Sequence, residues 1–437
     1  MIEIIQIFLH FFLFIFFTYF PINKFTAPRI SKTLDNCNFN FLFINILILL
    51  FLFLVFSFFR ISLNIVFLLI FSIYFILFIK NISNVFNELI SFKNFNLKII
   101  FFIICLAFFF NIAYKLEIGW DGLSIWIFKV NNFYNGKSYS DLFLNQEPFT
   151  QYPHLGSYVW AFFWKNSLIQ KEYLGRIFYA YTYVVSIFVL ANCIKNLPFS
   201  KKLFFILFII IFSFDFNNTI EGYQEYLIFS LLIFAIKILE ISKLKKSTDD
   251  YLYLFFLLNL FILSWIKNEA IFYSFFLLII FNIYKKFNKK ILIFSIITFL
   301  IIFLQIFITK YFFEVERVFQ IALTFETLLK KLTFIELFDR IYYTTIYIFH
   351  AVLKYPISII NILSIILVIK YRNQLKFCNY ILVFFCMNII FLYTIYIMTD
   401  LPVIWHLQTS IERLILQTSS LYIFLLIHLL NKKLIKI

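Results

Sequence analysis

The 437-residue chain is 63% hydrophobic and only 14% charged, and its mean hydropathy is +0.94. Because a soluble globular chain is nearer half apolar and a quarter charged, this composition excludes an ordinary soluble protein. The formal net charge of +16 does not indicate a nucleic-acid partner, because the basic residues flank apolar runs, as the anchoring charges of membrane proteins do.

Apolar runs near 20 residues recur along the chain, and such runs match the roughly 30 Å hydrocarbon core of a bilayer. We predict about 13 spans from these runs. They are 3–20, 40–59, 62–79, 98–115, 174–194, 203–216, 225–240, 251–266, 270–284, 291–310, 356–370, 379–398 and 414–430. Two further segments, 154–165 and 341–354, either span the membrane or lie along its interface. The predicted fold class is an all-α polytopic transmembrane bundle with interfacial helices.

The basic residues predict an orientation with the N-terminus outside. The inside loops then hold most of the 38 Lys and Arg residues, as the positive-inside tendency requires. All six tryptophans fall on the outside face in this topology, which indicates a built surface there. The longest polar stretch, 116–153, also falls outside, and four of the six glycines lie between 119 and 156. We therefore expect a large functional loop on the non-cytoplasmic face, where the backbone leaves the helical conformation.

The chain divides into three predicted parts. Residues 1–97 hold three accessory spans. Residues 98–310 form the catalytic transmembrane region, with its extracytoplasmic loop at 116–173. Residues 311–437 hold an interfacial helical loop and the C-terminal spans. Within that last part, 311–340 is amphipathic and lies either on the outer interface or in a solvated loop without chemistry.

Asp121 is the strongest candidate for chemistry, because it directly follows a predicted span and sits between Trp120 and Gly122. Glycine allows a tight turn and a close approach to a ligand. A carboxylate at the membrane edge is costly and suits a general base near neutral pH. The alternative is an ordinary loop aspartate that caps a helix over 122–134.

Other ionisable residues are expected at the same depth of the membrane. They are Asp215, Glu221 and Glu225 in SFDFNNTIEGYQEY, Lys267 and Glu269 in WIKNEA, and His406, Glu412 and Arg413 near the last span. Charged groups close to hydrocarbon usually mark a site or a pair, although snorkelling at the interface would also explain them. His154 is either a ligand or base, or an amphipathic filler. No metal-ligand spacing accompanies it.

The motifs WDGLSIW (120–126), QYP (151–153), GYQEYLIF (222–229), WIKNEA (265–270) and WHLQTSIERL (405–414) occur in this order. Together they resemble the GT-C superfamily of bacterial membrane glycosyltransferases, in particular the group around protein O-mannosyltransferases and the lipid A aminoarabinose transferase. The resemblance covers roughly 98–285 and 400–416. It implies a multi-span fold whose first large non-cytoplasmic loop carries the catalytic acid.

The resemblance assigns roles to individual residues. Asp121 takes the catalytic position, and the expected substrate-binding residues are Trp120, Lys129, Tyr152, His154, Glu225, Lys267, His406 and Arg413. Lys267 and Arg413 would face the donor phosphate, and Glu225 stands where relatives usually carry Asp. Trp120 and Tyr152 offer aromatic faces for a sugar. The chain departs from the pattern in lacking a paired acid at Asp121, so no metal and no cofactor are expected.

The resemblance implies an inverting glycosyltransferase of the bacterial inner membrane. Its donor would be a sugar on polyprenyl phosphate, and its acceptor a lipid, a glycan or a protein, with no nucleic-acid partner. Three alternatives remain open: a transporter or flippase of lipid-linked sugars, a polymerase or ligase of the O-antigen type, and a scaffold without enzymatic activity.

Overall fold

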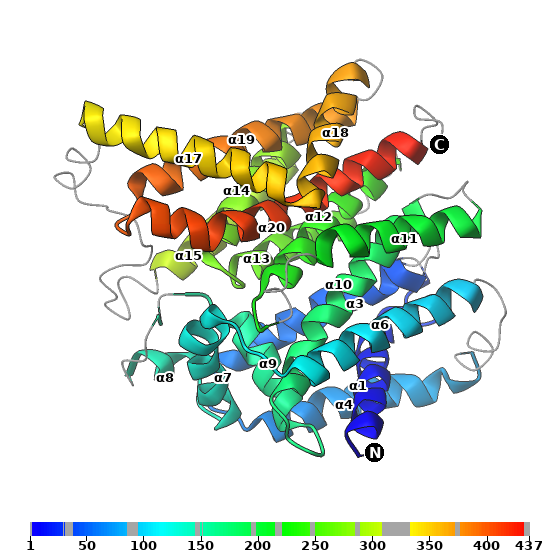
Figure 1. The fold of residues 1–437 in the computed structure, drawn as a ribbon. Helices are drawn as coiled ribbons and strands as arrows, with labels where there is room; N and C mark the ends of the chain where they lie inside the picture. Colours follow the sequence, from blue (N-terminus) through cyan, green and yellow to red (C-terminus); the bar gives the residue numbers. More distant parts are fainter. Residues whose placement is uncertain are drawn as a thin grey trace. The chain divides into compact units, whose positions relative to one another are not determined.

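The computed structural model describes residues 2–28, 30, 38–84, 95–144, 149–150, 152–193, 198–214, 221–244, 250–284, 289–307, 333–371 and 376–431. Regular structure in these residues is helical, which confirms the all-α fold class. The chain forms two compact units, and each is described by itself (Figure 1). Unit 1 is Met1–Asn192 with Asn217–Lys267, and unit 2 is Cys193–Phe216 with Asn268–Ile437.

Unit 1 contains the helices that carry most of the predicted site. They are α1 (Ile2–Tyr19), α3 (Asn38–Ser57), α4 (Leu63–Lys80), α6 (Phe95–Lys115), the π-helix η1 (Gly122–Trp126), α7 (Ile127–Tyr134), α8 (Tyr139–Leu144), α9 (Leu155–Lys165), α10 (Tyr173–Cys193), α12 (Glu225–Leu244) and α13 (Asp250–Ser264). Helix α3 packs against α1, α9 and α13, and α7 packs against α9.

The interior of unit 1 is built from aromatic rings in edge-to-face contact. The Phe14 ring centroid lies 4.8 Å from that of Phe163 and 5.2 Å from that of Phe178, and both pairs are nearly perpendicular. This geometry pairs the positive edge of one ring with the negative face of another. The apolar segment Tyr173–Ala191 of α10 is completely buried in the protein. A side chain at Gly175 would overlap the backbone of Trp160. Helix α10 is therefore the central helix of this unit.

Unit 2 contains the remaining described helices. They are α11 (Phe199–Phe214), α14 (Asn268–Tyr284), α15 (Lys289–Phe307), α17 (Phe334–Lys354), α18 (Pro356–Tyr371), α19 (Lys376–Met398) and α20 (Val403–Asn431). Helix α20 packs against α17, α18 and α19, and α14 packs against α15 and α19. The long α20 is thus the helix on which this unit is assembled.

The predicted number of about 13 spans is wrong for the described residues. Seven helices there are long and apolar enough to cross a bilayer, and an eighth is counted if the bent pair α17–α18 is one span. Helices α11, α13 and α14 have 16, 15 and 17 residues, short of the roughly 20 that a span needs. Helix α12 is long enough, but its charged residues make exposure to hydrocarbon costly. The chain is a multi-pass membrane protein, and its described residues contain fewer candidate spans than the hydropathy predicts.

The predicted large first loop is also not supported. Its described part is mostly helical, because η1, α7, α8 and α9 occupy much of 116–173. Helix α9 has 11 residues, nine of them buried in the protein, so 154–165 does not span the membrane. The polar residues and glycines that predicted a loop instead mark short helices packed against one another. Most of the amphipathic segment 311–340 and Asp215 lie outside the described residues.

Candidate functional site

The segment that carries Asp121 packs directly on the turn that precedes α12. The Gly119 N–H donates to the carbonyl oxygen of Glu221 at 2.8 Å. A Cβ on Gly122 would lie 2.8 Å from the same carbonyl oxygen, so only glycine allows this approach. Gly222 has φ +92°, a left-handed conformation that favours glycine. The glycines allow a close backbone approach, but to the 221–223 turn; a close approach to a ligand stays a prediction.

Asp121 is a buried carboxylate at the start of η1, with 7% of its surface exposed. Its side chain makes no capping hydrogen bond to that helix, so the alternative of a helix-capping aspartate is wrong. The neighbouring Trp120 is 59% exposed and offers its indole at the surface of unit 1. Helix capping therefore does not explain why the Asp121 side chain is buried.

A buried ion pair joins the first residue of α12 to the residue between α13 and α14. Lys267 Nζ lies 2.8 Å from Glu225 Oε1, and the two side chains are 4% and 0% exposed. Removing both charges from water costs several kcal/mol, which their attraction offsets only when the geometry is good. The pair links the motifs GYQEY and WIKNEA, which are about 40 residues apart in the chain.

The indole of Trp126 lies near two lysine ammonium groups. Lys129 Nζ is 5.4 Å from the ring centroid and Lys267 Nζ is 5.9 Å from a ring of the same side chain. Lys129 is fully buried and donates from Nζ to the carbonyl oxygen of Tyr152 at 2.5 Å. Burial lowers the pKa of Lys129 well below its usual value, because the interior disfavours the ammonium form. Three predicted site residues, Lys129, Tyr152 and Lys267, therefore surround one aromatic side chain.

His154 is a buried imidazole held between aromatic rings. Its Nε2 lies 2.7 Å from Ser57 Oγ, and its ring stacks on Tyr139 with centroids 4.1 Å apart. Ser57 Oγ donates its hydrogen to the carbonyl oxygen of Leu54. In the His154 tautomer that fits this bond, Nε2 carries the proton and donates to Ser57 Oγ. Burial first, and then the charge of Lys129, lower the pKa of His154 well below 6.5, so the ring is neutral at pH 7.

Buried polar atoms without hydrogen bonds gather around these residues. Within the described part of the chain, no partner is found for Trp126 Nε1, His154 Nδ1, Trp265 Nε1 or the side-chain amide of Gln224. The Trp265 ring lies 5.3 Å from that of His154, and Gln224 directly precedes Glu225. Most buried polar groups in folded proteins are hydrogen bonded. These atoms are therefore available to hydrogen-bond a polar ligand.

The sequence prediction missed four side chains of this cluster: Ser57, Trp126, Gln224 and Trp265. Three of them stand inside the motifs WDGLSIW, GYQEY and WIKNEA, so their position in those motifs was an available signal. Ser57 lies at the end of α3, where nothing in the sequence connects it to His154.

A second group of charges surrounds Arg176 at the start of α10. Its Nη1 donates to the carbonyl oxygen of Glu117 at 2.6 Å, and its Nε lies 2.9 Å from Glu172 Oε1. Burial raises the pKa of Glu221, and the nearby carboxylate of Glu117 raises it further. This group fixes the chain just before Asp121, because Glu117 and Gly119 both precede it and Gly119 is hydrogen-bonded to Glu221.

Two predicted site residues, His406 and Arg413, belong to unit 2 and lie on α20. His406 Nδ1 is 2.9 Å from Thr399 Oγ1, and its ring lies 5.1 Å from that of Tyr396. The charge of Arg413 acts electrostatically on both His406 and Tyr396. The motif WHLQTSIERL is thus held against the end of α19.

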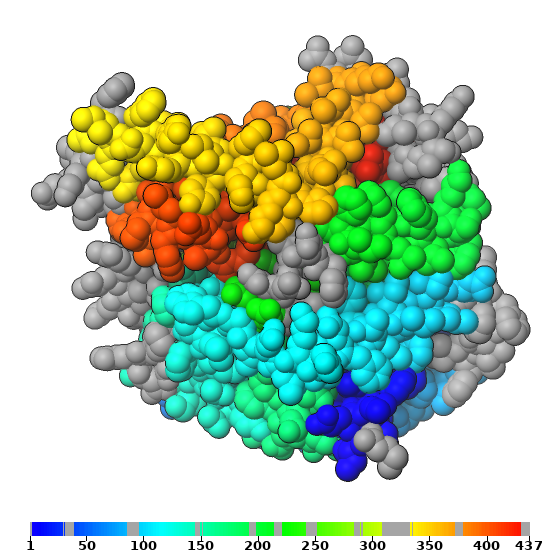
Figure 2. Space-filling model, in the orientation of Figure 1, coloured from blue at the N-terminus to red at the C-terminus, as the bar shows by residue number. Residues whose placement is uncertain are grey.

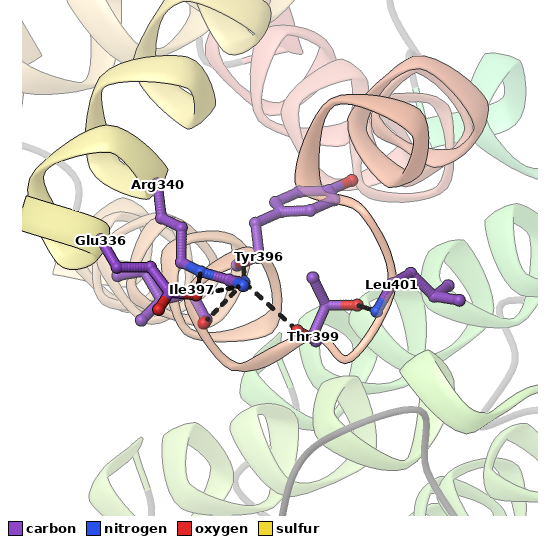
Figure 3. Close-up of polar contacts among 6 residues, drawn as sticks. All are labelled: Glu336, Arg340, Tyr396, Ile397, Thr399 and Leu401. Atoms are coloured by element: carbon purple, nitrogen blue, oxygen red, sulfur yellow. Dashed lines mark hydrogen bonds and ion pairs between the residues drawn. The ribbon is translucent and has the colours of Figure 1, made fainter. Parts of the chain in front are cut away.

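Arg340 fixes the end of α19, as Figure 3 shows. Its Nη1 lies 3.3, 3.2 and 3.2 Å from the carbonyl oxygens of Tyr396, Ile397 and Thr399. The last carbonyls of a helix lack partners within the helix, and a cation there is favourable. Glu336 Oε1 accepts from the Arg340 Nη2 at 2.8 Å and orients the guanidinium. Arg340, which the sequence analysis did not single out, thereby positions the segment that leads to His406.

Comparisons with family models, with curated proteins and with solved structures found no match to this chain. No family is therefore identified, and the class that the fold defines is an all-α membrane protein with seven or eight candidate spans in its described residues.

Proposed function

We propose that the protein is a membrane glycosyltransferase that transfers a sugar from a polyprenyl-phosphate donor to a lipid, glycan or protein acceptor. One observation carries the proposal: three motifs far apart in the sequence meet in unit 1. WDGLSIW contacts GYQEY through Gly119 and Glu221, and GYQEY contacts WIKNEA through Glu225 and Lys267. Trp126 of the first motif lies beside Lys267 of the third. Motifs that resemble one enzyme superfamily thus form one buried, charged cluster.

The chemistry assigns a step to Asp121. The acceptor oxygen forms a bond to the anomeric carbon of the sugar, and its proton goes to the Asp121 carboxylate. The bond between that carbon and the phosphate oxygen breaks, and its electron pair leaves with the polyprenyl phosphate. Direct attack of this kind inverts the anomeric configuration. Trp120 offers an exposed aromatic face to the apolar C–H surface of a sugar.

Cationic side chains would stabilise the leaving phosphate. Lys267 is held in place by Glu225, which makes Glu225 a positioning residue in this proposal. Lys129 adds a second amine beside the same indole. Charge-assisted hydrogen bonds to a developing phosphate charge are among the largest contributions to catalysis.

The test is transfer of radiolabel from a panel of polyprenyl-phosphate hexoses and pentoses by the full-length protein in proteoliposomes. We expect glycosyl product from the wild type and a loss of about 100-fold or more for Asp121→Asn, the usual contribution of a general base. Asp339→Asn is the matched control, since it removes an exposed carboxylate of α17. Equal transfer by wild type and Asp121→Asn would reject the role of Asp121.

The same proteoliposomes separate the alternatives. Movement of a labelled lipid-linked sugar across the bilayer without glycosyl product would favour a flippase or transporter. Extension of a lipid-linked glycan by several units would favour a polymerase of the O-antigen type. Neither transfer nor movement with any donor would favour a scaffold.

A further inference from the structure

Helix α17 presents a stripe of exposed apolar side chains along its whole length. Their exposed fractions run from 43% to 76%, and they are Ile335, Phe338, Tyr342, Ile346, Phe349 and Leu353. Because they recur every three or four residues, they lie on one face of the helix. Figure 2 shows α17, in yellow, at the surface of unit 2. An apolar face of this length on a soluble protein would be a liability, but in a membrane protein it has a natural partner.

A second exposed stripe runs beside the first and is polar. It contains Asp339, His350 and Lys354, separated by 11 and four residues, so that they also share a face. Asp339 stands near the start of the helix and His350 near its end. Polar groups therefore follow the apolar stripe along the helix and are not confined to one terminus.

The third face of α17 packs on α19 and α20 through polar contacts. Arg340 holds the end of α19 (Figure 3). Gln408 Nε2 of α20 donates to Tyr347 Oη of α17 at 2.9 Å. Thr344 and Ala351 of α17 are buried. These contacts fix the rotation of α17, so that the two exposed stripes point away from unit 2.

The chain bends by 101° between α17 and α18. Most exposed side chains of α18 are apolar and include Ile359, Ile362, Ile366 and Ile369. With 16 residues, α18 is short of the roughly 20 that a span needs, and the 101° bend prevents α17 and α18 from forming one straight span. If α17 crossed the bilayer instead, Asp339 and His350 would be carried into the hydrocarbon, where ionisable side chains are costly.

We propose that α17 lies in the plane of the bilayer as an interfacial helix whose apolar stripe contacts lipid acyl chains. The polar stripe then faces the headgroups and water, and Arg340 couples the helix to the segment that holds His406. The occupant of the apolar stripe is the lipid surface, because α17 packs on α18 and on the candidate span α19, whose exposed side chains are also mostly apolar. This inference does not depend on the chemistry that the protein performs.

The test is depth measurement by spin labels on the full-length protein in proteoliposomes. Single cysteines replace Ile335, Tyr342, Phe349 and Leu353 in a background from which the five native cysteines have been removed. Accessibility to oxygen and to a water-soluble nickel complex gives the depth of each label. We expect all four to lie within about 5 Å of one depth, since an interfacial helix buries its apolar face by roughly 5–10 Å.

A crossing helix gives a different result, because its depth changes by about 1.5 Å per residue, or roughly 27 Å from 335 to 353. Labels at Val383 and Ile390 of α19, a candidate span, are the internal control and should differ in depth by about 10 Å. A gradient along α17 overturns the proposal. High accessibility to the nickel complex at all four α17 positions, with the α19 gradient intact, also overturns it, since the stripe would then face water.

Discussion

The two units treat charge in different ways. In unit 1, Lys267 and Glu225 form an ion pair whose side chains are 4% and 0% exposed. In unit 2, Lys354 and Glu412 form a pair at 3.4 Å whose side chains are 55% and 31% exposed. Water screens the second pair, whereas the first pair has only protein around it. The same residue types therefore mark a candidate site in unit 1, whereas in unit 2 they lie at the aqueous edge of the proposed interfacial helix α17.

The largest expected effect comes from breaking the buried pair. Lys267→Met leaves Glu225 without its ion-pair partner in the interior and should destabilise unit 1 by about 3–5 kcal/mol, measured by thermal unfolding in detergent. Lys354→Met, the matched change in unit 2, should cost about 0–1 kcal/mol. The double variant Glu225→Gln with Lys267→Met should recover much of the loss. An equal effect of the two lysine variants would contradict the contrast between the units.

An intermediate effect is expected at Arg340. Arg340→Gln removes charge-assisted hydrogen bonds from the carbonyl oxygens at the end of α19 and should cost about 1.5–3 kcal/mol. Hydrogen exchange should increase at residues 396–406, because Thr399 connects this end to His406. Glu336→Gln leaves the guanidinium in place and should have a smaller effect. Unchanged exchange in the arginine variant would show that α19 ends stably without this contact.

The smallest expected effect is a pH dependence at His154. Its pKa is lowered in the folded state, whereas the unfolded chain takes up a proton near 6.5. Stability should therefore fall as the pH drops below about 6.5, with a slope of at most about 1.4 kcal/mol per pH unit from this group. His154→Gln should flatten the dependence between pH 7 and pH 5. The measurement is the melting temperature against pH, and parallel curves for wild type and variant would argue against this assignment.

Hydropathy predicted the class of protein but overcounted its spans. The run 379–398 and the described helix α19 agree closely, because 20 apolar residues without a break have no other stable placement. The run 225–240 became α12, which is buried in the protein and holds the pair Lys237–Glu240. Hydropathy measures how apolar a segment is, and a helix buried by protein is as apolar as one buried by lipid.

The candidate site was predictable residue by residue but not as an arrangement. Glu225 and Lys267 were singled out because charges beside apolar runs are costly, and the structure pairs them. The contact of Lys267 with Trp126 joins residues 141 positions apart, and that of His154 with Ser57 joins residues 97 positions apart. The prediction of a large loop around Asp121 was wrong, because short polar helices and loops have similar composition.

The composition alone predicts an all-α membrane protein, because a chain with long apolar runs and few charges is stable only in a bilayer. Which charged residues are buried together and which face outward depends on how the helices pack. Hydrophobicity is a property of each segment alone, whereas the energetic cost or gain of a charge depends on what packs against it.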